Sequence, residues 1–578
     1  MRMRTSFFLV SSLVGTFGCT APVAVHDVAP PPAPPHAPSS EAVLARILDL
    51  GEHDNRVQAQ LKTLCKTIGP RLTGTERFDQ AARWAVEQFQ SFGLSAHLET
   101  WGEFPTAFRR GYASGGMVAP QGIDYDFTTT AWSPGTKGPA RGPAILEPTT
   151  EEALATAKAR FANAWIVNSD PAPSAKIRRE IREAAEAAGA LGYVRPGSRN
   201  GRMHMGGNHR VELEKAKPQV QIQLQYAQYA DLVARLKGDG AEAIELEFDV
   251  ANVLAPGPVA CTNVVADLVG SEHPDEFVVV GGHLDSWDGA EGAQDNGTGS
   301  ATTIEAARLI AAAGGKPKRT IRFILFGGEE EGLLGSEGYV KAHEAELAKT
   351  SLALIHDGGG TAAVGLATNY PMLADFESVF APVKDLHAAY PFRVEESTGL
   401  VNSGDSDHAP FLQAGVPGFF WKQSEKGYER VHHTQFDVFE SVDPVQEQHT
   451  ALVVAVAAWG FAELDHLLDR TDMKPAPRRL MGVSLDGTTV RSIDKDGKAG
   501  AAEWQVGDTI LTIDGVEAKD RDSIGDLLQQ GSGKKVFRLK RGDATVESTI
   551  DWSSETEEKE RADRIARREA WMRAHPAR

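Results

Sequence analysis

Two adjacent glutamates, Glu329 and Glu330, follow the apolar run Ile321–Phe326 and a pair of glycines. Imidazole nitrogens and carboxylate oxygens bind divalent ions of the zinc type, and a catalytic metal site keeps one position open for water. Further groups of this kind follow other predicted strands or open glycine-rich loops: His283, Asp295, Asp357 and His433. These residue types predict a metal-dependent hydrolase.

The candidate ligands divide into two sets that share one residue. His283 and Asp357 are expected to hold one ion. Glu330 and His433 are expected to hold a second ion, and Asp295 is expected to bridge the two. Two ions about 3.5 to 4 Å apart can share a water molecule and lower its pKa. We therefore expect two zinc ions in each chain.

One glutamate is left outside both sets. Glu329 lies beside the expected metals without binding them, which suits a general base that takes a proton from water and later gives it to the leaving amine. Asp285, two residues after His283, is placed to accept the other ring proton of that imidazole. Asp437 is expected to act in the same way near His433.

The segment after Pro258 alternates between strand and helix patterns. This alternation predicts an α/β fold in which a mixed, mostly parallel sheet is covered by helices on both faces. Functional groups of such sheets gather at the carboxyl ends of the strands. The predicted strands are Thr262–Leu268, Glu276–Gly281, Thr320–Phe326 and Ser351–His356, and the predicted helices are Gly299–Ala313, Gly335–Lys349 and Gln446–Leu468.

Composition argues against several other functions. The formal net charge of −19 leaves too little basic surface for general phosphate neutralisation, so no nucleic-acid partner is expected. The chain has 3 cysteines, too few for a cysteine-based zinc site. A single His or Asp is usually a capped loop or surface group, but a set of such residues at strand ends is much better explained by a metal site.

Several ordered motifs together resemble the M28 metallopeptidases, and most closely their carboxypeptidase Q-like branch. The resemblance covers about Glu41–Asp469 and implies the zinc exopeptidase fold. The motifs that carry it are Ile68–Gly74, Gly282–Asp285, Asp295–Gly297, Gly328–Ser336, Ser406–Phe411 and His433–Thr434.

The resemblance implies the same ligand roles as the residue types, with Glu329 as the acid and base. The family spacing His-Thr-x-x-Asp selects His433 as the ligand and leaves His432 a role toward substrate. Asp407, in the Ser406–Phe411 motif, is a candidate for positioning a ligand or contacting substrate. Asn296 stands where many members carry a second aspartate, but that position is not a ligand.

The resemblance also implies the activity. We expect an exopeptidase that acts on the terminal bond of short peptides, with aminopeptidase action first and dipeptidase or carboxypeptidase action as the alternative. A binding protein on the same scaffold is disfavoured because all the ligand positions and the base are present. A glutaminyl cyclase-like transfer is less favoured still, because such relatives usually bind one zinc ion.

The amino terminus predicts export. Arg2 and Arg4 precede the apolar run Phe7–Val14, which is too short to span a bilayer. Cys19 follows a small residue as in a bacterial lipobox, so a lipid on Cys19 would be the only expected membrane contact. The protein is expected in the bacterial cell envelope or secreted.

Two cysteines remain besides Cys19. Cys65 and Cys261 are an even pair in an exported protein and are expected either to form one disulfide or to stay as two buried thiols. The sequence favours neither outcome.

Composition and resemblance together predict the domain order. The carboxyl-terminal module resembles a PDZ domain whose loop, Met481, Gly482 and Val483, would bind a peptide carboxyl terminus. The expected segments are a signal peptide at 1–18, a proline-rich tether at 19–40, an M28 peptidase domain at 41–104 and 256–472, an inserted β-rich protease-associated (PA) domain at 105–255, the PDZ-like β module at 478–552, and a charged, solvated helical tail at 553–578.

Overall fold

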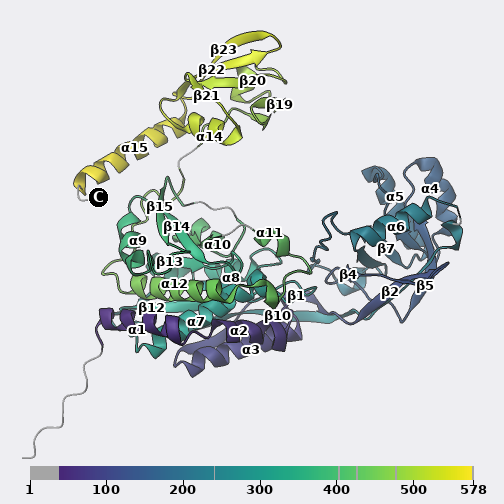
Figure 1. Ribbon diagram of the computed structural model, residues 1–578, viewed down its shortest axis with the longest axis horizontal. Helices are drawn as coiled ribbons and strands as arrows, with labels where there is room; N and C mark the ends of the chain where they lie inside the picture. Colours follow the sequence, from purple (N-terminus) through teal and green to yellow (C-terminus); the bar gives the residue numbers. More distant parts are fainter. Residues whose placement is uncertain (1–37, 240, 401–403, 425–426, 476–477, 576–578) are drawn as a thin grey trace, which may run out of the picture. The chain divides into compact units, whose positions relative to one another are not determined.

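The computed structural model describes residues 38–239, 241–400, 404–424, 427–475 and 478–575. The predicted signal peptide, Cys19 and nearly all of the predicted tether lie outside the described residues. Within these ranges, no helix is both long and apolar enough to cross a membrane. Figure 1 follows the described elements from α1 to α15.

A mixed six-stranded sheet carries the candidate site, in the order β1-β10-β12-β11-β13-β16. Strands β12, β11, β13 and β16 are parallel, whereas β10 and β1 are antiparallel to their neighbours. The predicted mixed α/β sheet is therefore confirmed. The bounds are β1 Ser95–Arg109, β10 Val253–Leu268, β11 His273–His283, β12 Arg319–Phe326, β13 Thr350–Ile355 and β16 Gly418–Phe420.

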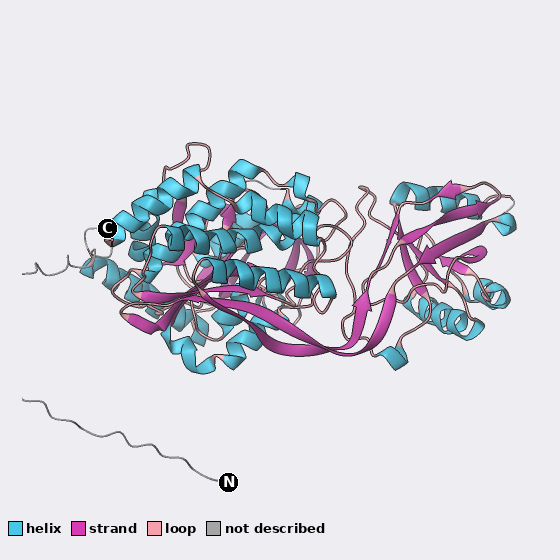
Figure 2. Cartoon of the chain, turned by 90° about the horizontal axis from the view of Figure 1, so that it is seen from below, coloured by secondary structure: helices cyan, strands magenta, loops and turns pink. Residues whose placement is uncertain are grey.

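Helices cover both faces of this sheet, as Figure 2 shows in cyan around the magenta strands. Val278 and Val280 of β11 belong to one buried cluster and Val279 to another, because successive side chains of a strand point to opposite faces. The first cluster includes side chains from α1 (Ser40–His53), α2 (Val57–Lys62), α3 (Glu76–Ser91), α7 (Thr298–Ala312), α9 (Leu373–Phe380) and α12 (Pro444–Ala462). The second includes side chains from α8 (Leu334–Ala342) and α10 (His408–Gln413).

A small second sheet, in the order β15-β14-β17, lies after the parallel strands in the chain. Its strand β17 directly follows Phe420 and Trp421 and precedes the short helix α11, so these elements carry the segment before His433. The bounds are β14 Ala363–Asn369, β15 Arg393–Ser397, β17 Lys422–Gln423 and α11 Tyr428–Val431.

An insert separates β1 from β10 in the chain. The two strands pair as far as Arg109 and Val253, so the insert starts later and ends earlier than the expected 105–255. It contains an eight-stranded sheet in the order β3-β2-β9-β5-β6-β7-β8-β4. Its elements are β2 Ala113–Ala119, β3 Ile123–Asp124, β4 Phe127–Thr129, β5 Ala140–Leu146, α4 Glu151–Ala157, β6 Trp165–Val167, α5 Ala175–Ala188, β7 Gly192–Pro196, β8 Val220–Leu224, α6 Tyr226–Leu236 and β9 Glu245–Val250.

The carboxyl-terminal module is β-rich, as expected, and has its own core around Trp504, Phe537 and Trp552. In the predicted peptide-binding loop, the carbonyls of Met481 and Gly482 accept hydrogen bonds from within the module. Its elements are β18 Val483–Asp486, β19 Thr489–Ile493, α13 Lys498–Ala501, β20 Thr509–Ile513, β21 Val516–Glu517, α14 Arg521–Gln529, β22 Lys534–Arg541 and β23 Ala544–Asp551.

The final helix, α15 (Thr556–Ala574), lies where a helical tail was expected, but it is not fully solvated. Arg564 is buried and donates a hydrogen bond of 2.9 Å to the carbonyl of Thr398. Arg567 contacts Asp472 at 2.6 Å. Some charged side chains of this helix therefore contact other parts of the protein, and the others are exposed to solvent.

Both remaining cysteines are free thiols. Cys65 and Cys261 are buried in different apolar clusters. Burial raises the pKa of each thiol to about 12. Of the two alternatives for this pair, the structure contains the buried thiols.

Candidate metal centre and active site

His283, the last residue of β11, has one ring nitrogen tied back and the other directed into the site. Its Nδ1 lies 3.0 Å from the backbone carbonyl of Asp285 and 3.4 Å from a carboxylate oxygen of the same residue. Nε2 lies 3.1 Å from Asp357 Oδ1, just beyond the end of β13. Asp285 therefore orients the ring chiefly through its carbonyl, while the expectation named its side chain.

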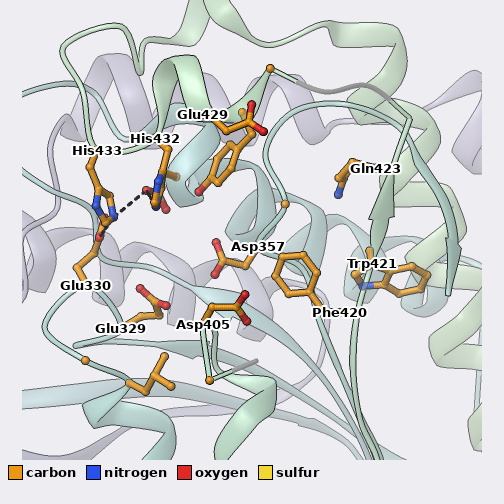
Figure 3. A pocket seen from close by; sticks show the side chains of 17 residues that line it. Glu329, Glu330, Asp357, Asp405, Phe420, Trp421, Gln423, Glu429, His432 and His433 are labelled. Atoms are coloured by element: carbon orange, nitrogen blue, oxygen red, sulfur yellow. Dashed lines mark ion pairs between the residues drawn. The ribbon is translucent and has the colours of Figure 1, made fainter. Parts of the chain in front are cut away.

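A second donor group forms around His433. Its Nε2 lies 2.8 Å from Glu330 Oε2, and Figure 3 shows the two side chains next to each other. The other oxygen of Glu330 accepts a hydrogen bond of 3.1 Å from the backbone N–H of Trp287. This hydrogen bond holds the Glu330 carboxylate in position after the end of β12.

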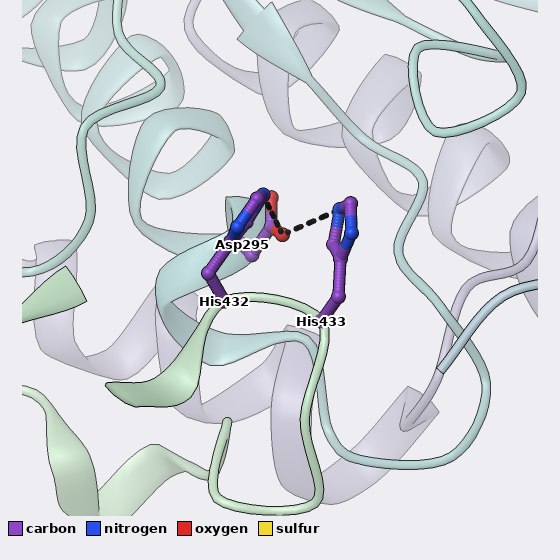
Figure 4. A group of neighbouring side chains, drawn as sticks. All are labelled: Asp295, His432 and His433. Carbon is purple, nitrogen blue, oxygen red and sulfur yellow. Dashed lines mark ion pairs between the residues drawn. The ribbon is translucent and has the colours of Figure 1, made fainter. Parts of the chain in front are cut away.

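Asp295 lies between the two groups, in the turn Ala293–Gly297. Its Oδ1 is 3.3 Å from His283 Nε2, and its Oδ2 is 3.4 Å from His433 Nε2. Figure 4 shows the second contact together with a longer one of 3.9 Å to His432. Burial raises the pKa of Asp295, but the interaction with His283 outweighs it and the pKa falls to about 2.

Glu329 is placed beside these groups and belongs to neither donor pair. Its Oε2 is 3.9 Å from His283 Nε2. Burial is the main reason that the pKa of Glu329 lies well above its usual range. The charge of His283 opposes this rise, and the nearby charges of Asp357 and Asp407 add to it.

The carboxylate of Asp285 holds the turn that carries both glutamates. Its Oδ2 accepts hydrogen bonds from Thr73 Oγ1 at 3.0 Å and from the backbone N–H of Gly328 and Glu330 at 3.1 and 3.2 Å. The sequence did not identify the role of Thr73. Its one signal is its place in the Ile68–Gly74 motif.

Arg71 has a similar role in the loop before Asp295. It is completely buried, and its guanidinium donates to the backbone carbonyls of Leu284, Glu291 and Gly292 at 2.8, 3.0 and 2.6 Å. Its single charge therefore ties the end of β11 to the next loop. Nothing about an arginine in a short motif predicts these partners.

The insert contacts the backbone of the ligand His433. The N–H of Met205 donates to the carbonyl of His433 at 2.7 Å, and His204 forms an antiparallel bridge with Thr434. His433 has a φ of 53°, a left-handed conformation that is costly for a residue with a side chain. The insert therefore supports the backbone of this candidate ligand.

The remaining candidate residues lie around the centre. Asp437 accepts hydrogen bonds from the N–H of Gln294 and Asp295, at 2.6 and 3.2 Å, so it supports the Asp295 turn where a role near His433 was expected. Asp407 is completely buried, and burial raises its pKa to about 7. Asn296 Nδ2 donates to the carbonyl of His356 at 2.7 Å, which an aspartate could not do.

A cavity of about 640 Å³ opens onto these groups (Figure 3). Aromatic side chains form part of its wall. Asp405 and Glu429 add carboxylates to the lining besides those of the candidate donor groups. The described lining residues other than glycine are Asp295, Glu329, Glu330, Leu333, Asp357, Asp405, Phe420, Trp421, Gln423, Tyr428, Glu429, His432 and His433.

The donor atoms fit divalent cations. Buried Glu330 Oε2 and Asp295 Oδ2 accept no hydrogen bond from any described residue, although an imidazole nitrogen lies within 3.4 Å of each. Burial and then the charge of Asp295 raise the pKa of Glu330 well above its usual range, a cost that a cation would remove. Donor atoms of His283, Asp295 and Glu330 lie within 4.8 Å of one another, and those of His283 and Asp357 lie equally close, with a carboxylate oxygen of Glu329 beside them.

Comparison with protein families finds a match to "Peptidase family M28" over residues 263–458. Residues 263–458 form an M28 peptidase domain, and the protein is a metallopeptidase. The matched residues of this M28 peptidase run from within β10 to within α12 and contain both donor groups and Glu329.

Known proteins resemble the chain over between a third and three quarters of its length. It is 27% identical to carboxypeptidase Q of Mus musculus over 441 residues, covering 75% of this chain and 91% of that protein. It is 33% identical over 192 residues to aminopeptidase YwaD of Bacillus subtilis (strain 168), covering 32% of this chain and 41% of that protein. A solved structure, the peptidase M28 precursor of Shewanella amazonensis SB2B, matches with a TM-score of 0.55 and 25% identity, covering 75% and 99%.

Proposed function

We propose that this M28 metallopeptidase is an exported aminopeptidase that binds two zinc ions and removes the amino-terminal residue of short peptides. The observation that carries the proposal is the position of Asp295. Its two carboxylate oxygens face different histidines, at 3.3 and 3.4 Å. A single residue that faces two donor groups in this way is suited to bridge two cations.

Each donor group supplies one histidine and one carboxylate besides Asp295. His283 and Asp357 would hold one ion, and His433 and Glu330 the other. This nitrogen and oxygen donor set is typical of zinc. When bound, zinc ions polarise the scissile carbonyl and lower the pKa of the attacking water.

The remaining chemistry is assigned to Glu329. It lines the cavity and stands outside both donor pairs. A carboxylate oxygen of Glu329 accepts the proton of the attacking water and then donates it to the nitrogen of the leaving amine as the C–N bond breaks. Asp285 keeps Glu329 in place through its hydrogen bonds to the backbone of Gly328 and Glu330.

Charge in the cavity favours recognition of a free amine. Asp405 and Glu429 line it besides the proposed ligands and Glu329, and none of its described lining residues is Lys or Arg. A carboxypeptidase needs a cationic group to hold the terminal carboxylate of its substrate. An ammonium group at the amino terminus of a peptide is complementary to this lining.

Dipeptidase or carboxypeptidase action is the second candidate. The observation that favours it is the similarity to carboxypeptidase Q over 91% of that protein's length. The residues that select one terminus lie on loops, and loops vary more between relatives than the sheet that positions the metals. Sequence similarity over the whole chain therefore says less about which peptide terminus is recognised than the residues that line the cavity do.

Blocked dipeptides separate the candidates. We expect acetylation of the substrate's amino group to lower kcat/KM by about 100-fold or more, because it removes the charge that the carboxylates recognise. Amidation of the dipeptide carboxylate should change kcat/KM by less than about threefold. The measurement is steady-state cleavage of one dipeptide in its free, acetylated and amidated forms by the zinc-loaded protein.

Each other pattern contradicts the aminopeptidase assignment. Loss of cleavage on amidation alone identifies a carboxypeptidase, and loss with either block identifies a dipeptidase. No cleavage of any peptide by the zinc-loaded protein identifies a binding protein. Cyclisation of an amino-terminal glutamine with one zinc per chain identifies a glutaminyl cyclase-like enzyme.

The other segments keep their expected roles as part of the proposal. The insert is assigned as a PA domain, and the carboxyl-terminal module as a PDZ domain that binds a peptide carboxyl terminus. Export through the amino-terminal segment, with a lipid on Cys19, would place the enzyme in the cell envelope.

A further inference from the structure

A second cavity, of about 500 Å³, lies in the insert and carries charge opposite to that of the metal site. It is lined by the loop 130–134, by parts of β7 and β8, and by the loop that includes His204 and Met205. Its basic lining residues are Arg195, His204 and Lys217, and none of the described residues that line it is Asp or Glu. In a chain of net charge −19, this is a locally basic pocket.

Arg195 is the cation of this cavity that has no counter-ion. It is partly buried in β7, and burial lowers the pKa of its guanidinium. Among the described residues, no carboxylate lies within ion-pair distance of Arg195, whereas Lys217 contacts Glu186 and Arg199 contacts Asp170. A partly desolvated guanidinium without a partner is unfavourable, so its surroundings suit an incoming anion.

The cavity borders the strip of backbone that holds the metal ligand His433. His204 lines the cavity and pairs with Thr434, and the next residue, Met205, donates its N–H to the carbonyl of His433 at 2.7 Å. His204 therefore links the segment that carries His433 to the lining of the basic cavity.

We propose that Arg195 binds the carboxyl-terminal carboxylate of a peptide whose amino terminus lies at the metal centre. Guanidinium and carboxylate form two parallel hydrogen bonds, and no covalent bond changes at this end of the substrate. The inference rests on the proposed aminopeptidase function and names its substrate class: short peptides with a free carboxyl terminus. An extended peptide of three to five residues spans roughly 10 to 18 Å.

The test compares peptides of two to six residues that share an amino-terminal residue, each with a free or an amidated carboxyl terminus. In the wild-type enzyme, amidation should raise KM about tenfold at the length that reaches Arg195, with kcat nearly unchanged. Arg195→Ala should raise KM of the free acid to that of the amide and leave the amide unaffected. Arg195→Lys keeps the charge and should give a smaller rise.

Arg199→Ala is the matched control, because it removes the same charge from an exposed residue that lies outside the cavity. It should leave both KM values unchanged. Equal KM values for acid and amide at every length, in an enzyme that cleaves them, overturn the inference and leave the aminopeptidase assignment standing. An Arg195→Ala effect of equal size on acid and amide shows a structural role and also overturns it. Absence of all cleavage contradicts the proposed function instead.

Discussion

Replacing Glu329 with glutamine is expected to lower kcat by about 100-fold to 10,000-fold while the zinc content stays the same. Glutamine keeps the size and polarity of the side chain but cannot carry the proton from water to the leaving amine. The zinc content should not change because Glu329 lies outside both donor pairs, 3.9 Å from His283 Nε2. The measurement is kcat and bound zinc on the same preparation.

Glu337→Gln is a matched control for this variant. Glu337 is an exposed residue in the first turn of α8, eight positions after Glu329 in the chain. Its side chain is not among the described residues that line the metal-site cavity. Its replacement should leave kcat and zinc content at wild-type values. A Glu329→Gln enzyme with wild-type kcat would refute the assigned base.

Removing the shared carboxylate is expected to have the largest effect. Asp295→Ala should lower the zinc content from two ions to less than one per chain and kcat/KM by about 1,000-fold or more, because both donor groups lose a ligand at once. Zinc raises the thermal unfolding temperature of a protein that binds it. Because Asp295→Ala binds less zinc, added zinc should no longer raise its unfolding temperature as it does for the wild-type protein. Zinc content after dialysis and unfolding temperature with and without zinc are the measurements.

Asp385→Ala provides the control for Asp295→Ala. Asp385 is exposed and pairs only at the surface, with Arg393 at 3.1 Å, so its loss should change neither zinc content nor activity. An Asp295→Ala protein that kept two zinc ions would contradict the bridging role. Retention of one tightly bound ion with full activity would contradict it as well.

The positions of the candidate donor residues at strand ends were predictable from the sequence, because each residue belongs to its own local pattern. His283 ends a strand, Glu330 follows two glycines after another strand, and parallel strands bring such ends to one edge of the sheet. Neither prediction required knowledge of a contact distant in the chain. The alternation of strand and helix gave the mixed sheet for the same reason.

The supports of the site were not predictable because they join residues far apart in sequence. Thr73 and Gly328 are 255 positions apart, yet the threonine hydroxyl accepts the glycine N–H at 2.8 Å. The hydrogen bond between Met205 and His433 joins the insert to the loop that carries His433. Both of its atoms belong to the backbone, so the residue types do not reveal it. The extension of β1 and β10 beyond the expected boundary was hidden by residues such as Pro256 and Gly257, which weaken a strand pattern.

The most direct test of the account is a titration of the metal-free, full-length protein with zinc, following peptidase activity and bound metal together. Activity should reach its maximum at two zinc ions per chain, and the Glu329→Gln protein should bind the same two ions without that activity. Full activity at one ion per chain, or two bound ions in the Asp295→Ala protein, would contradict a nucleophile prepared between two metals that share Asp295.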